Sequence, residues 1–370
     1  MTSRPSLRSS RMHWTPGPDM FIIRNAIHED VPQLLDMART VHSNNLPPDA
    51  DALGAIVEQS LKSFNGEASL DERTFTFVLV DDETGSVAGT SAIMARRGTP
   101  ARPRLYLKVR HYEHYSEDLQ DGQVQATVQL MQDVDGVTEV GGLVLPSAYR
   151  GNGKRLGSML SRVRFSFMGL HPDWFMDRVV AEVMGVLTDD CQTKLWEHLG
   201  RRFINLSYQE ADVFSRTSKE FITSLFPKNE IYISLMPPEA RKLIGAVSPD
   251  ATPALHMLGE LGFEEVGEVD PFDGGPYLSV HRDAIPLVSA TKVVKQGPAG
   301  APEGPEGFAS VRVDGSFRCV RCPFYIEDDL LTLPAEAMKA LQVAPGDTVG
   351  CTPEREHAGA IKSNSDEVPE

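Results

Sequence analysis

The 370-residue sequence predicts an α/β protein in which helices flank a mixed, mostly antiparallel sheet, with a small β-rich module at the C-terminal end. Two observations indicate the main sheet. Short apolar segments typical of strands alternate with segments of helical periodicity, and a short acidic turn joins two of the strand segments as in a β-hairpin. The module is indicated by a Pro/Gly-rich stretch that separates the last strand-rich segment from the rest of the chain.

A strand, a helix and a hairpin are the first predicted elements. FIIRNA, residues 21–26, has the composition of an apolar strand. In the next stretch Val31, Leu34 and Ala38 recur at helical spacing behind an acidic first turn, which predicts a helix. The segment TFTFVLVDDETGSVAGTSAIMA, residues 74–95, is predicted to form the hairpin.

A strand, a basic turn and a helix follow. The strand is TEVGGLVL, residues 138–145, and the helix has one apolar face formed by Leu156, Leu160, Val163 and Phe167. A further strand, RVVAEVMG, and a further helix, CQTKLWEHLG, complete this part of the chain. The basic turn therefore joins the end of a strand to the start of a helix.

Composition divides the chain into five expected segments. They are a disordered leader over residues 1–19, a main domain over 20–285, a linker over 286–307, a β-rich module over 308–355 and a tail over 356–370. In the module, SVRVDGSFRCVRCPFYI predicts a hairpin around Asp314 and Gly315. A short helix and a strand are expected after it.

The overall charge limits the classes of partner. The sequence has 36 Lys and Arg against 52 Asp and Glu, a formal net charge of -16, which argues against a protein that binds nucleic acid. No apolar run reaches the ~18 residues of a membrane span, and the first residues lack a secretory signal. Four cysteines in this length predict reduced thiols. We therefore expect a cytoplasmic protein that acts on small molecules.

One stretch contrasts with this acidic background. YRGNGKRLGSMLSRVRF, residues 149–165, has five basic side chains, three glycines and no carboxylate. Unpaired N–H groups and the positive dipole end at a helix N-terminus attract anions, and glycines let the backbone approach closely. The expected pyrophosphate cradle consists of Arg150, Gly151, Asn152, Gly153, Lys154 and Arg155. The alternative is a surface turn with solvated cations.

Two common phosphate-binding motifs are excluded. In a nucleotide-triphosphate loop the Lys is followed by Ser or Thr, whereas Arg155 follows Lys154 here. The dinucleotide motif G-x-G-x-x-G requires a third glycine where the sequence has Leu156, and the preceding elements include a hairpin. The turn must therefore belong to another class of anion site.

The turn resembles the coenzyme A loop of the GCN5-related N-acetyltransferase superfamily, whose pattern is Arg/Gln-x-x-Gly-x-Gly/Ala. Arg150, Gly153 and their spacing match this pattern. Arg155 stands where the last small residue belongs, and a shift of two residues would make Gly157 its equivalent. The resemblance implies a GCN5-related acyltransferase fold.

Longer segments resemble one family within that superfamily, arginine N-succinyltransferase. LWEHLGRRF, YQEADVFS, KEFITSLFPKNEIYISLMPPEARKLIGAV, PDATPALHMLGELGF and DPFDGGP occur in family order, and the resemblance extends over about residues 20–352. It implies a CoA-dependent N-succinyltransferase of arginine catabolism, with succinyl-CoA as co-substrate, L-arginine as acceptor and no metal. It also implies a homo-oligomer.

The resemblance carries several residues over. Leu143 falls on a family residue that contacts succinyl-CoA, and Val144 and Leu145 continue this strand. Backbone N–H groups near Leu143 and Leu145 are expected to polarise the thioester carbonyl. A family His falls on His114, and the family's proton-donor His falls on Ser248.

Ser248 departs from the family at a position that bears on catalysis. The amine must lose a proton and the CoA thiolate must gain one, and serine cannot supply a group that titrates near neutrality. His256, His114, Tyr208 or Tyr232 are alternative proton carriers. Two other functions stay open. One is a related transferase with another acceptor such as ornithine, and the other is a non-catalytic CoA-binding subunit.

Four further features have structural interpretations. Cys319 and Cys322 form a CxxC that is better explained as strand residues than as half a zinc site. His171 is expected to cap a helix, and Trp196 is expected in the core. Glu210 and Asp212 could bind a guanidinium, but we favour solvated surface carboxylates.

Overall fold

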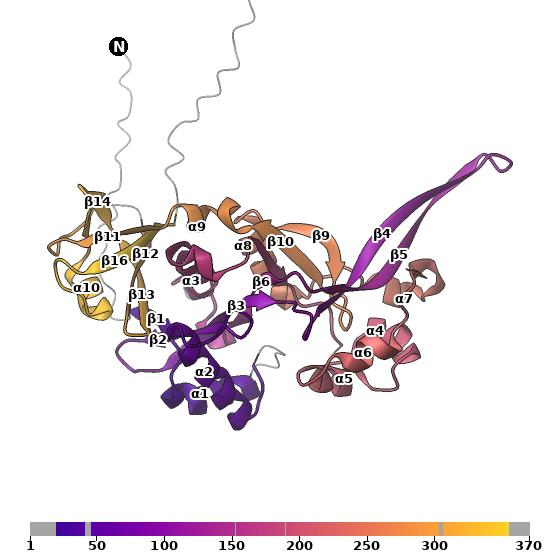
Figure 1. Cartoon of the computed structure of the whole chain (residues 1–370), viewed down its shortest axis with the longest axis horizontal. Coiled ribbons are helices and arrows are strands. Elements are labelled where there is room, and N and C mark those ends of the chain that lie inside the picture. The colour runs from indigo at the N-terminus through magenta and orange to yellow at the C-terminus, as the bar shows by residue number, and fades with distance from the viewer. Residues whose placement is uncertain (1–19, 41–45, 152, 189, 303–305, 355–370) are drawn as a thin grey trace, which may run out of the picture.

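A computed structural model describes residues 20–40, 46–151, 153–188, 190–302 and 306–354. Within these residues sixteen strands form one continuous sheet along an elongated molecule (Figure 1). Among the described strands the pairs β6–β7 and β11–β15 are parallel and the other pairs are antiparallel. The predicted mixed, mostly antiparallel sheet is therefore confirmed.

The central part of the sheet contains the strands expected from the sequence, together with a second hairpin. Its strands are β1 (Phe21–Asn25), β2 (Thr74–Asp81), β3 (Val87–Arg97), β6 (Val137–Val144), β7 (Arg178–Glu182), β9 (Glu264–Val269) and β10 (Pro276–His281). β2 and β3 form the predicted hairpin. The pair β9–β10, which the sequence analysis did not predict, is also antiparallel.

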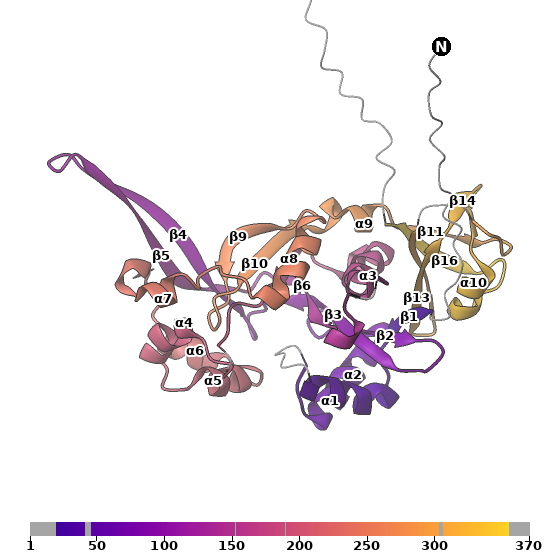
Figure 2. The ribbon, with the colours of Figure 1, turned by 180° about the vertical axis from the view of Figure 1, so that it is seen from behind.

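Helices cover both faces of this central sheet. α3 (Leu156–Leu170) lies on one face, and α1 (Val31–Thr40) and α2 (Ala50–Phe64) lie on the other (Figure 2). The alternation of side chains along a strand serves both layers, because Leu79 packs in the α3 cluster and Val78 packs with α1 and α2. The helices predicted over α1 and α3 are present, whereas α2 was not predicted.

Five phenylalanines join these layers. Phe64 from α2 contacts Phe75 and Phe77 of β2 with ring centroids 5.0 and 5.6 Å apart, and Phe167 of α3 at 5.4 Å. Phe317, from the C-terminal part of the chain, lies 5.1 Å from Phe167. All five are fully buried, so this cluster couples both helical layers to the C-terminal module.

The C-terminal module is part of the same sheet. It contains β11 (Lys292–Gln296), β12 (Glu306–Val313), β13 (Ser316–Pro323), β14 (Tyr325–Glu327), β15 (Leu330–Thr332), β16 (Thr348–Pro353) and α10 (Ala335–Leu341). The expected hairpin is present as β12–β13, with Val313 opposite Ser316. β13 also pairs with β1, so the module is hydrogen-bonded to the central sheet.

The linker expected over residues 286–307 is partly wrong. Its first part forms α9 (Pro286–Ser289) and β11. Leu287 and Val288 pack in the α3 cluster, and Val294 packs in the core of the module. Apolar burial therefore orders this segment, and the Pro/Gly-rich composition describes only its second part.

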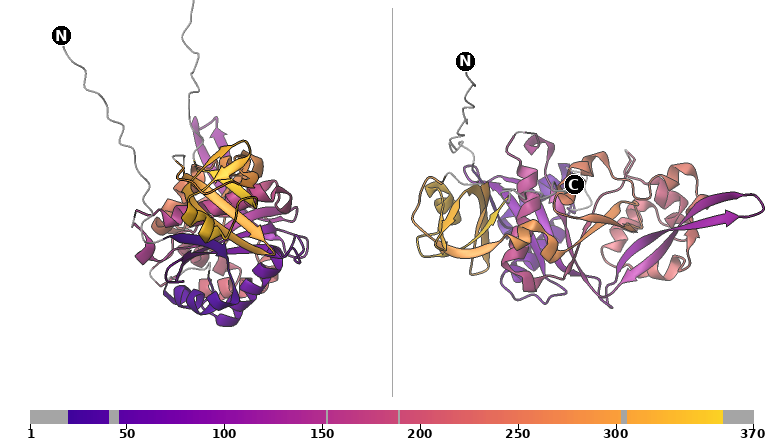
Figure 3. Two further views of the ribbon diagram at one scale, coloured as in Figure 1. Left: turned by 90° about the vertical axis from the view of Figure 1, so that its left-hand side faces the viewer. Right: turned by 90° about the horizontal axis from the view of Figure 1, so that it is seen from above.

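A long hairpin and a helical lobe extend the opposite end of the molecule. β4 (Arg104–Ser116) and β5 (Asp121–Asp133) project from the body as an arm (Figure 3). The lobe contains α4 (Lys194–His198), α5 (Tyr208–Ser215), α6 (Glu220–Leu225), β8 (Ile231–Tyr232) and α7 (Pro238–Arg241), and α8 (Thr252–Gly259) follows it. Trp196 is fully buried in the lobe, as predicted.

The predicted leader, residues 1–19, and the predicted tail, residues 356–370, lie outside the described residues. None of the helices in the described part of the chain has the length and apolar composition needed to cross a bilayer.

We expect Phe64→Ala to lower the free energy of unfolding by about 3–5 kcal/mol, because it removes a fully buried ring and leaves a cavity among four others. Urea titration followed by circular dichroism measures this change. Phe214→Ala is the control, since that side chain is 51% exposed and should change stability by no more than about 0.5 kcal/mol. Equal losses in the two variants would contradict the role of the cluster.

Candidate active site where two parallel strands diverge

The parallel strands β6 and β7 are paired over a short distance. Their register runs from Thr138 opposite Val179 to Val140 opposite Ala181, although β6 continues to Val144. On the other side of β6 the pairing with β3 shifts, because Thr90 and Ala92 face residues that are three positions apart in β6. Such a bulge bends a strand and redirects its backbone groups.

Gly142 lies within this bulge. Its φ of +59° is a left-handed conformation, and a Cβ there would lie 2.9 Å from the Cβ of Ala92. Two constraints therefore disfavour any side chain at position 142: the positive φ and the close approach of β3. The bulge separates the paired part of β6 from the segment predicted to bind the thioester.

The predicted thioester segment can offer mainly backbone groups to a ligand. Val144 and Leu145 are 3% and 9% exposed, and Leu143 packs partly against the α3 cluster. Because these side chains face the protein interior, the backbone N–H groups of this segment are the groups that can bind a ligand where β6 and β7 diverge. This geometry fits the backbone role expected from the sequence.

The basic turn follows directly and has an unusual backbone. Gly151, Gly153 and Arg155 all have positive φ, of 70°, 76° and 55°. The guanidinium Nε of Arg150 donates a 2.8 Å hydrogen bond to the carbonyl of Leu145, which ties the turn to the end of the strand. Asn152 lies outside the described residues.

The turn leads into the first residues of α3. Arg155 is the N-cap of this helix, and no side chain caps its first N–H groups. Arg150, Lys154 and Arg155 are exposed at the same place, and the Lys154 Nζ also lies 5.2 Å from the ring of Phe21. The fold therefore brings the predicted residues 143–145 and the described residues of the turn together at one helix N-terminus, a favourable position for an anion.

Ser248 lies beside the extension of β7. Its backbone N–H donates a 2.9 Å hydrogen bond to the carbonyl of Met184, and Met184 lies two residues beyond the end of that strand. It is half-buried, and its side chain makes no capping hydrogen bond to the short helix that follows. The backbone of Ser248 is thus held beside the chain that continues β7.

His114 does not join these residues. It lies on β4 opposite Gln123, two pairs from the tip of the projecting arm, and is exposed. The arm extends away from α3 and from the basic turn (Figure 3). Within one chain His114 is therefore separated from the other predicted site residues.

The structure adds ionisable groups that the sequence analysis did not single out. Glu182 ends β7, one residue beyond the last position that pairs with β6, and its carboxylate accepts a 2.8 Å hydrogen bond from the Tyr277 hydroxyl. Part of the Glu182 side chain is exposed to solvent, but the protein around the carboxyl group limits the hydration of that group. This desolvation, reinforced by the charges of Asp270 and Glu139, raises the pKa of Glu182 to about 8. A carboxylate inside the apolar run RVVAEVMG was the available signal.

Two neighbouring aspartates share this environment. Desolvation, followed by repulsion from nearby carboxylates, raises the pKa of Asp270 and of Asp273 to about 7. Asp273 also accepts hydrogen bonds from the N–H groups of Gly185 and Gly275, at 2.9 and 2.7 Å. It therefore fixes the chain beyond β7 against the loop between β9 and β10.

Cys319 and Cys322 lie on β13, as predicted. Cys319, Cys322 and Cys351 are at most 2% exposed, and burial raises the pKa of the Cys322 thiol to about 12. No group of three or more His, Cys, Asp or Glu side chains in the described residues is arranged to hold a metal ion. His171 provides the C-cap of α3, and burial lowers its pKa to about 4.

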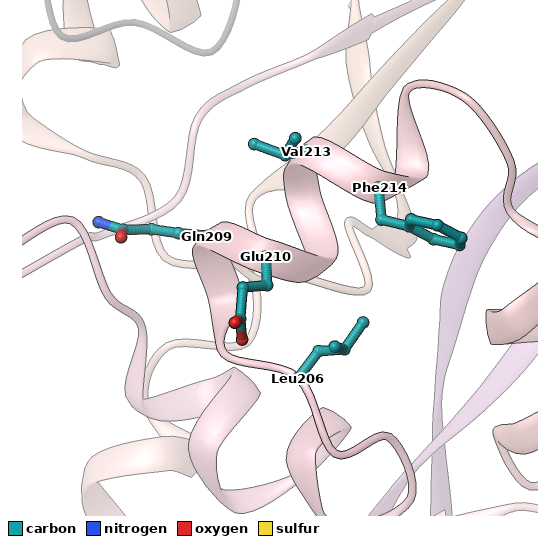
Figure 4. A pocket seen from close by; sticks show the side chains of 5 residues that line it. All are labelled: Leu206, Gln209, Glu210, Val213 and Phe214. Carbon is teal, nitrogen blue, oxygen red and sulfur yellow. The ribbon is translucent and has the colours of Figure 1, made fainter.

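Glu210 and Asp212 are engaged locally. Glu210 accepts hydrogen bonds from the backbone and hydroxyl of Ser207 in a capping box, both at 2.8 Å, and Asp212 pairs with Arg216 at 2.9 Å. An open hollow of about 430 Å³ beside α5 is lined mainly by apolar atoms (Figure 4). Both carboxylates have partners at or near α5, which supports their interpretation as surface carboxylates and not as guanidinium ligands.

Two family models match the chain. The one described as "Arginine N-succinyltransferase beta subunit" covers residues 21–287, and the one for the C-terminal domain of that subunit covers residues 291–353. The chain belongs to the arginine N-succinyltransferase family. The resemblance drawn from the sequence is confirmed.

Individual family members match over nearly their whole length. An arginine N-succinyltransferase of Escherichia coli (strain 55989 / EAEC) is 32% identical over 335 residues, which are 89% of this chain and 96% of the relative. The Shigella dysenteriae serotype 1 protein of the same name has the same identity and coverage. The structure of "arginine/ornithine succinyltransferase subunit AI" from Pseudomonas aeruginosa matches with a TM-score of 0.78 and 28% identity, over 90% of this chain and 99% of that one. The chain therefore shares the fold of that solved family member, including its sheet.

We expect Arg150→Glu to raise the Kd for CoA at least about tenfold, because it places a carboxylate beside the phosphates and removes the tie to Leu145. Isothermal titration calorimetry measures the affinity, and a circular dichroism spectrum checks the fold. Lys242→Glu is the control, since it makes the same charge change at an exposed position directly after α7. An unchanged affinity in Arg150→Glu would count against the cradle.

Proposed function

We propose that this chain transfers the succinyl group of succinyl-CoA to the α-amine of L-arginine, in arginine catabolism. The observation that carries the proposal is the arrangement of the β6 bulge, the basic turn and the start of α3 in a chain of the arginine N-succinyltransferase family. Members of this family are acyltransferases that use CoA. The succinyl donor and the arginine acceptor are taken from the names of the relatives.

The parts of the site have complementary roles in this proposal. The turn residues Arg150, Lys154 and Arg155 and the first N–H groups of α3 hold the CoA phosphates. The backbone beyond Gly142 then receives the thioester, and an N–H group near Leu143 stabilises the negative charge that develops on its carbonyl oxygen. Holding the amine beside this carbonyl supplies much of the acceleration.

A second acceptor is suggested by the name of a relative. The solved relative from Pseudomonas aeruginosa is named for both arginine and ornithine. L-ornithine is therefore the second candidate acceptor. A non-catalytic CoA-binding subunit is the alternative from a different class, because Ser248 replaces the family histidine.

Release of CoA thiol distinguishes these functions. The purified protein is mixed with succinyl-CoA and, in turn, with L-arginine, L-ornithine, L-lysine and no amine, and free thiol is followed with a colorimetric disulfide reagent. We expect the fastest release with L-arginine, and a product mass that is larger than arginine by one succinyl group. Measurable CoA binding without release in the presence of any amine would favour the non-catalytic subunit.

We expect Ser248→His to increase kcat with L-arginine at least about tenfold, because it restores a group that can protonate the departing thiolate near neutral pH. The same thiol assay measures this change. Ser69→His is the control, since Ser69 is an exposed residue before β2. No gain in Ser248→His would show that this position does not face the reacting atoms.

We also propose that the protein works in the cytoplasm as a homo-oligomer on small molecules, without nucleic acid or membrane. The arm formed by β4 and β5 supports an assembly, because it exposes the apolar side chains Tyr112, Tyr115, Leu119 and Val124 away from the body. Light scattering during size-exclusion chromatography should give a mass that is a multiple of the chain mass.

A further inference from the structure

We propose that Glu182 is the group that removes a proton from the acceptor amine, and that Tyr277 is the residue that positions its carboxylate. The inference rests on the proposed acyl transfer and names a catalytic residue for it. Glu182 ends β7 where this strand has separated from β6, which is also where the thioester segment of β6 begins.

Glu182 faces the side of the sheet opposite α3. Val179, Ala181 and Val183 pack in the α3 cluster, so alternation along β7 directs Glu182 to the other face. Tyr277 lies directly opposite Glu182 in the register of β10 and belongs to the same face. The carboxylate is therefore accessible from the side of the divergence that the α3 layer does not cover.

The hydrogen bond from Tyr277 gives the carboxylate a defined orientation. The phenol hydroxyl donates to Oε2 at 2.8 Å, and no other side chain among the described residues forms a hydrogen bond with Glu182. Tyr277 is 4% exposed, and its ring stacks under the guanidinium of Arg104 with 4.1 Å between the guanidinium carbon and the ring centroid. A rigid donor thus holds one oxygen, and Oε1 is left for a substrate.

Ser248 lies on the same stretch of chain. Its N–H binds the carbonyl of Met184, two residues after Glu182, so both positions flank the end of β7. In the proposed reaction the two groups differ. Glu182 accepts the proton of the amine, whereas the thiolate takes its proton from solvent in this chain, because Ser248 has no group that titrates near neutrality.

The charges around Glu182 suit a proton acceptor. The charged and titratable groups that act on it come from five neighbouring elements or loops: Arg97, Glu139, Lys219, Asp270, Asp273 and Tyr277. Repulsion from the carboxylates, added to desolvation, raises its pKa to about 8, which makes it a stronger base than an ordinary glutamate. The same negative surroundings attract an ammonium group.

The proton balance is complete with groups in the chain and solvent. The ammonium of the acceptor gives one proton to Glu182, and the neutral nitrogen attacks the thioester carbonyl to form a C–N bond. The C–S bond then breaks with its electron pair on sulfur. The second proton of the nitrogen leaves as the amide forms, one proton is taken up by the thiolate, and Glu182 returns its own proton to solvent.

Glu182→Gln is the decisive variant. We expect kcat with L-arginine to fall at least about 100-fold near neutral pH, because glutamine cannot accept the proton, while the Kd for CoA stays unchanged. Glu182→Asp should restore part of the activity. The control is Glu265→Gln, an exposed position on β9 that pairs with Leu278, and it should keep wild-type kcat.

The pH dependence of kcat/KM separates a base from a structural residue. Glu182 must be ionised to act, so wild-type kcat/KM should rise with pH through about 8 and then level off. Because the Tyr277 hydrogen bond lowers the pKa of Glu182, Tyr277→Phe should shift this rise to higher pH. In Glu182→Gln, kcat/KM should rise with pH only as the α-ammonium group of free arginine loses its proton.

The outcomes distinguish this inference from the proposed function. An active wild-type enzyme together with wild-type kcat and pH profile in Glu182→Gln overturns the inference alone. If Glu182→Gln does not fold, an unshifted pH profile in folded Tyr277→Phe overturns it. Wild-type turnover with an acceptor other than arginine would overturn the proposed acceptor but would leave the same variants decisive. No turnover with any acceptor would overturn both.

Discussion

The short parallel pairing of β6 with β7 is the constraint on which the site depends. Three residues of each strand are held in register, after which the bulge at Gly142 redirects β6. Hydrogen-bonding groups of the sheet are then released at one place instead of being used by a neighbouring strand. The basic turn, the start of α3, Glu182 and Ser248 all surround this opening.

The two sides of the opening differ in charge. On one side Arg150, Lys154 and Arg155 present cations at a helix N-terminus, where the dipole adds to their effect. On the other side Glu182 and Asp270 lie among carboxylates. In the proposed function, these local patches, and not the net charge of -16, let an acidic protein bind a polyanionic carrier and a cationic amine together.

Local signals in the sequence were sufficient to single out the basic turn and to predict the strands and helices that flank it. R-G-N-G after an apolar strand marked the turn that precedes α3, and the alternation of Leu105, Leu107 and Val109 is a local signal for β4. The linker prediction followed the Pro and Gly content of the segment. The apolar residues of α9 and β11 instead form ordered elements in its first part. Glu182 has one local signal, a carboxylate inside the apolar run RVVAEVMG, but that signal alone does not indicate a role. Its contact with Tyr277 joins residues 95 positions apart and depends on a register set by the whole sheet.

The position of β1 has a consequence for how the protein is made. Residues 22–24 are hydrogen-bonded on one side to β2 and on the other to residues 318–320. During synthesis on the ribosome, the backbone groups on one edge of β1 have no hydrogen-bond partner until about three hundred further residues have emerged. An exposed strand edge is a site for intermolecular pairing, so the nascent chain should need protection by chaperones until translation is nearly finished.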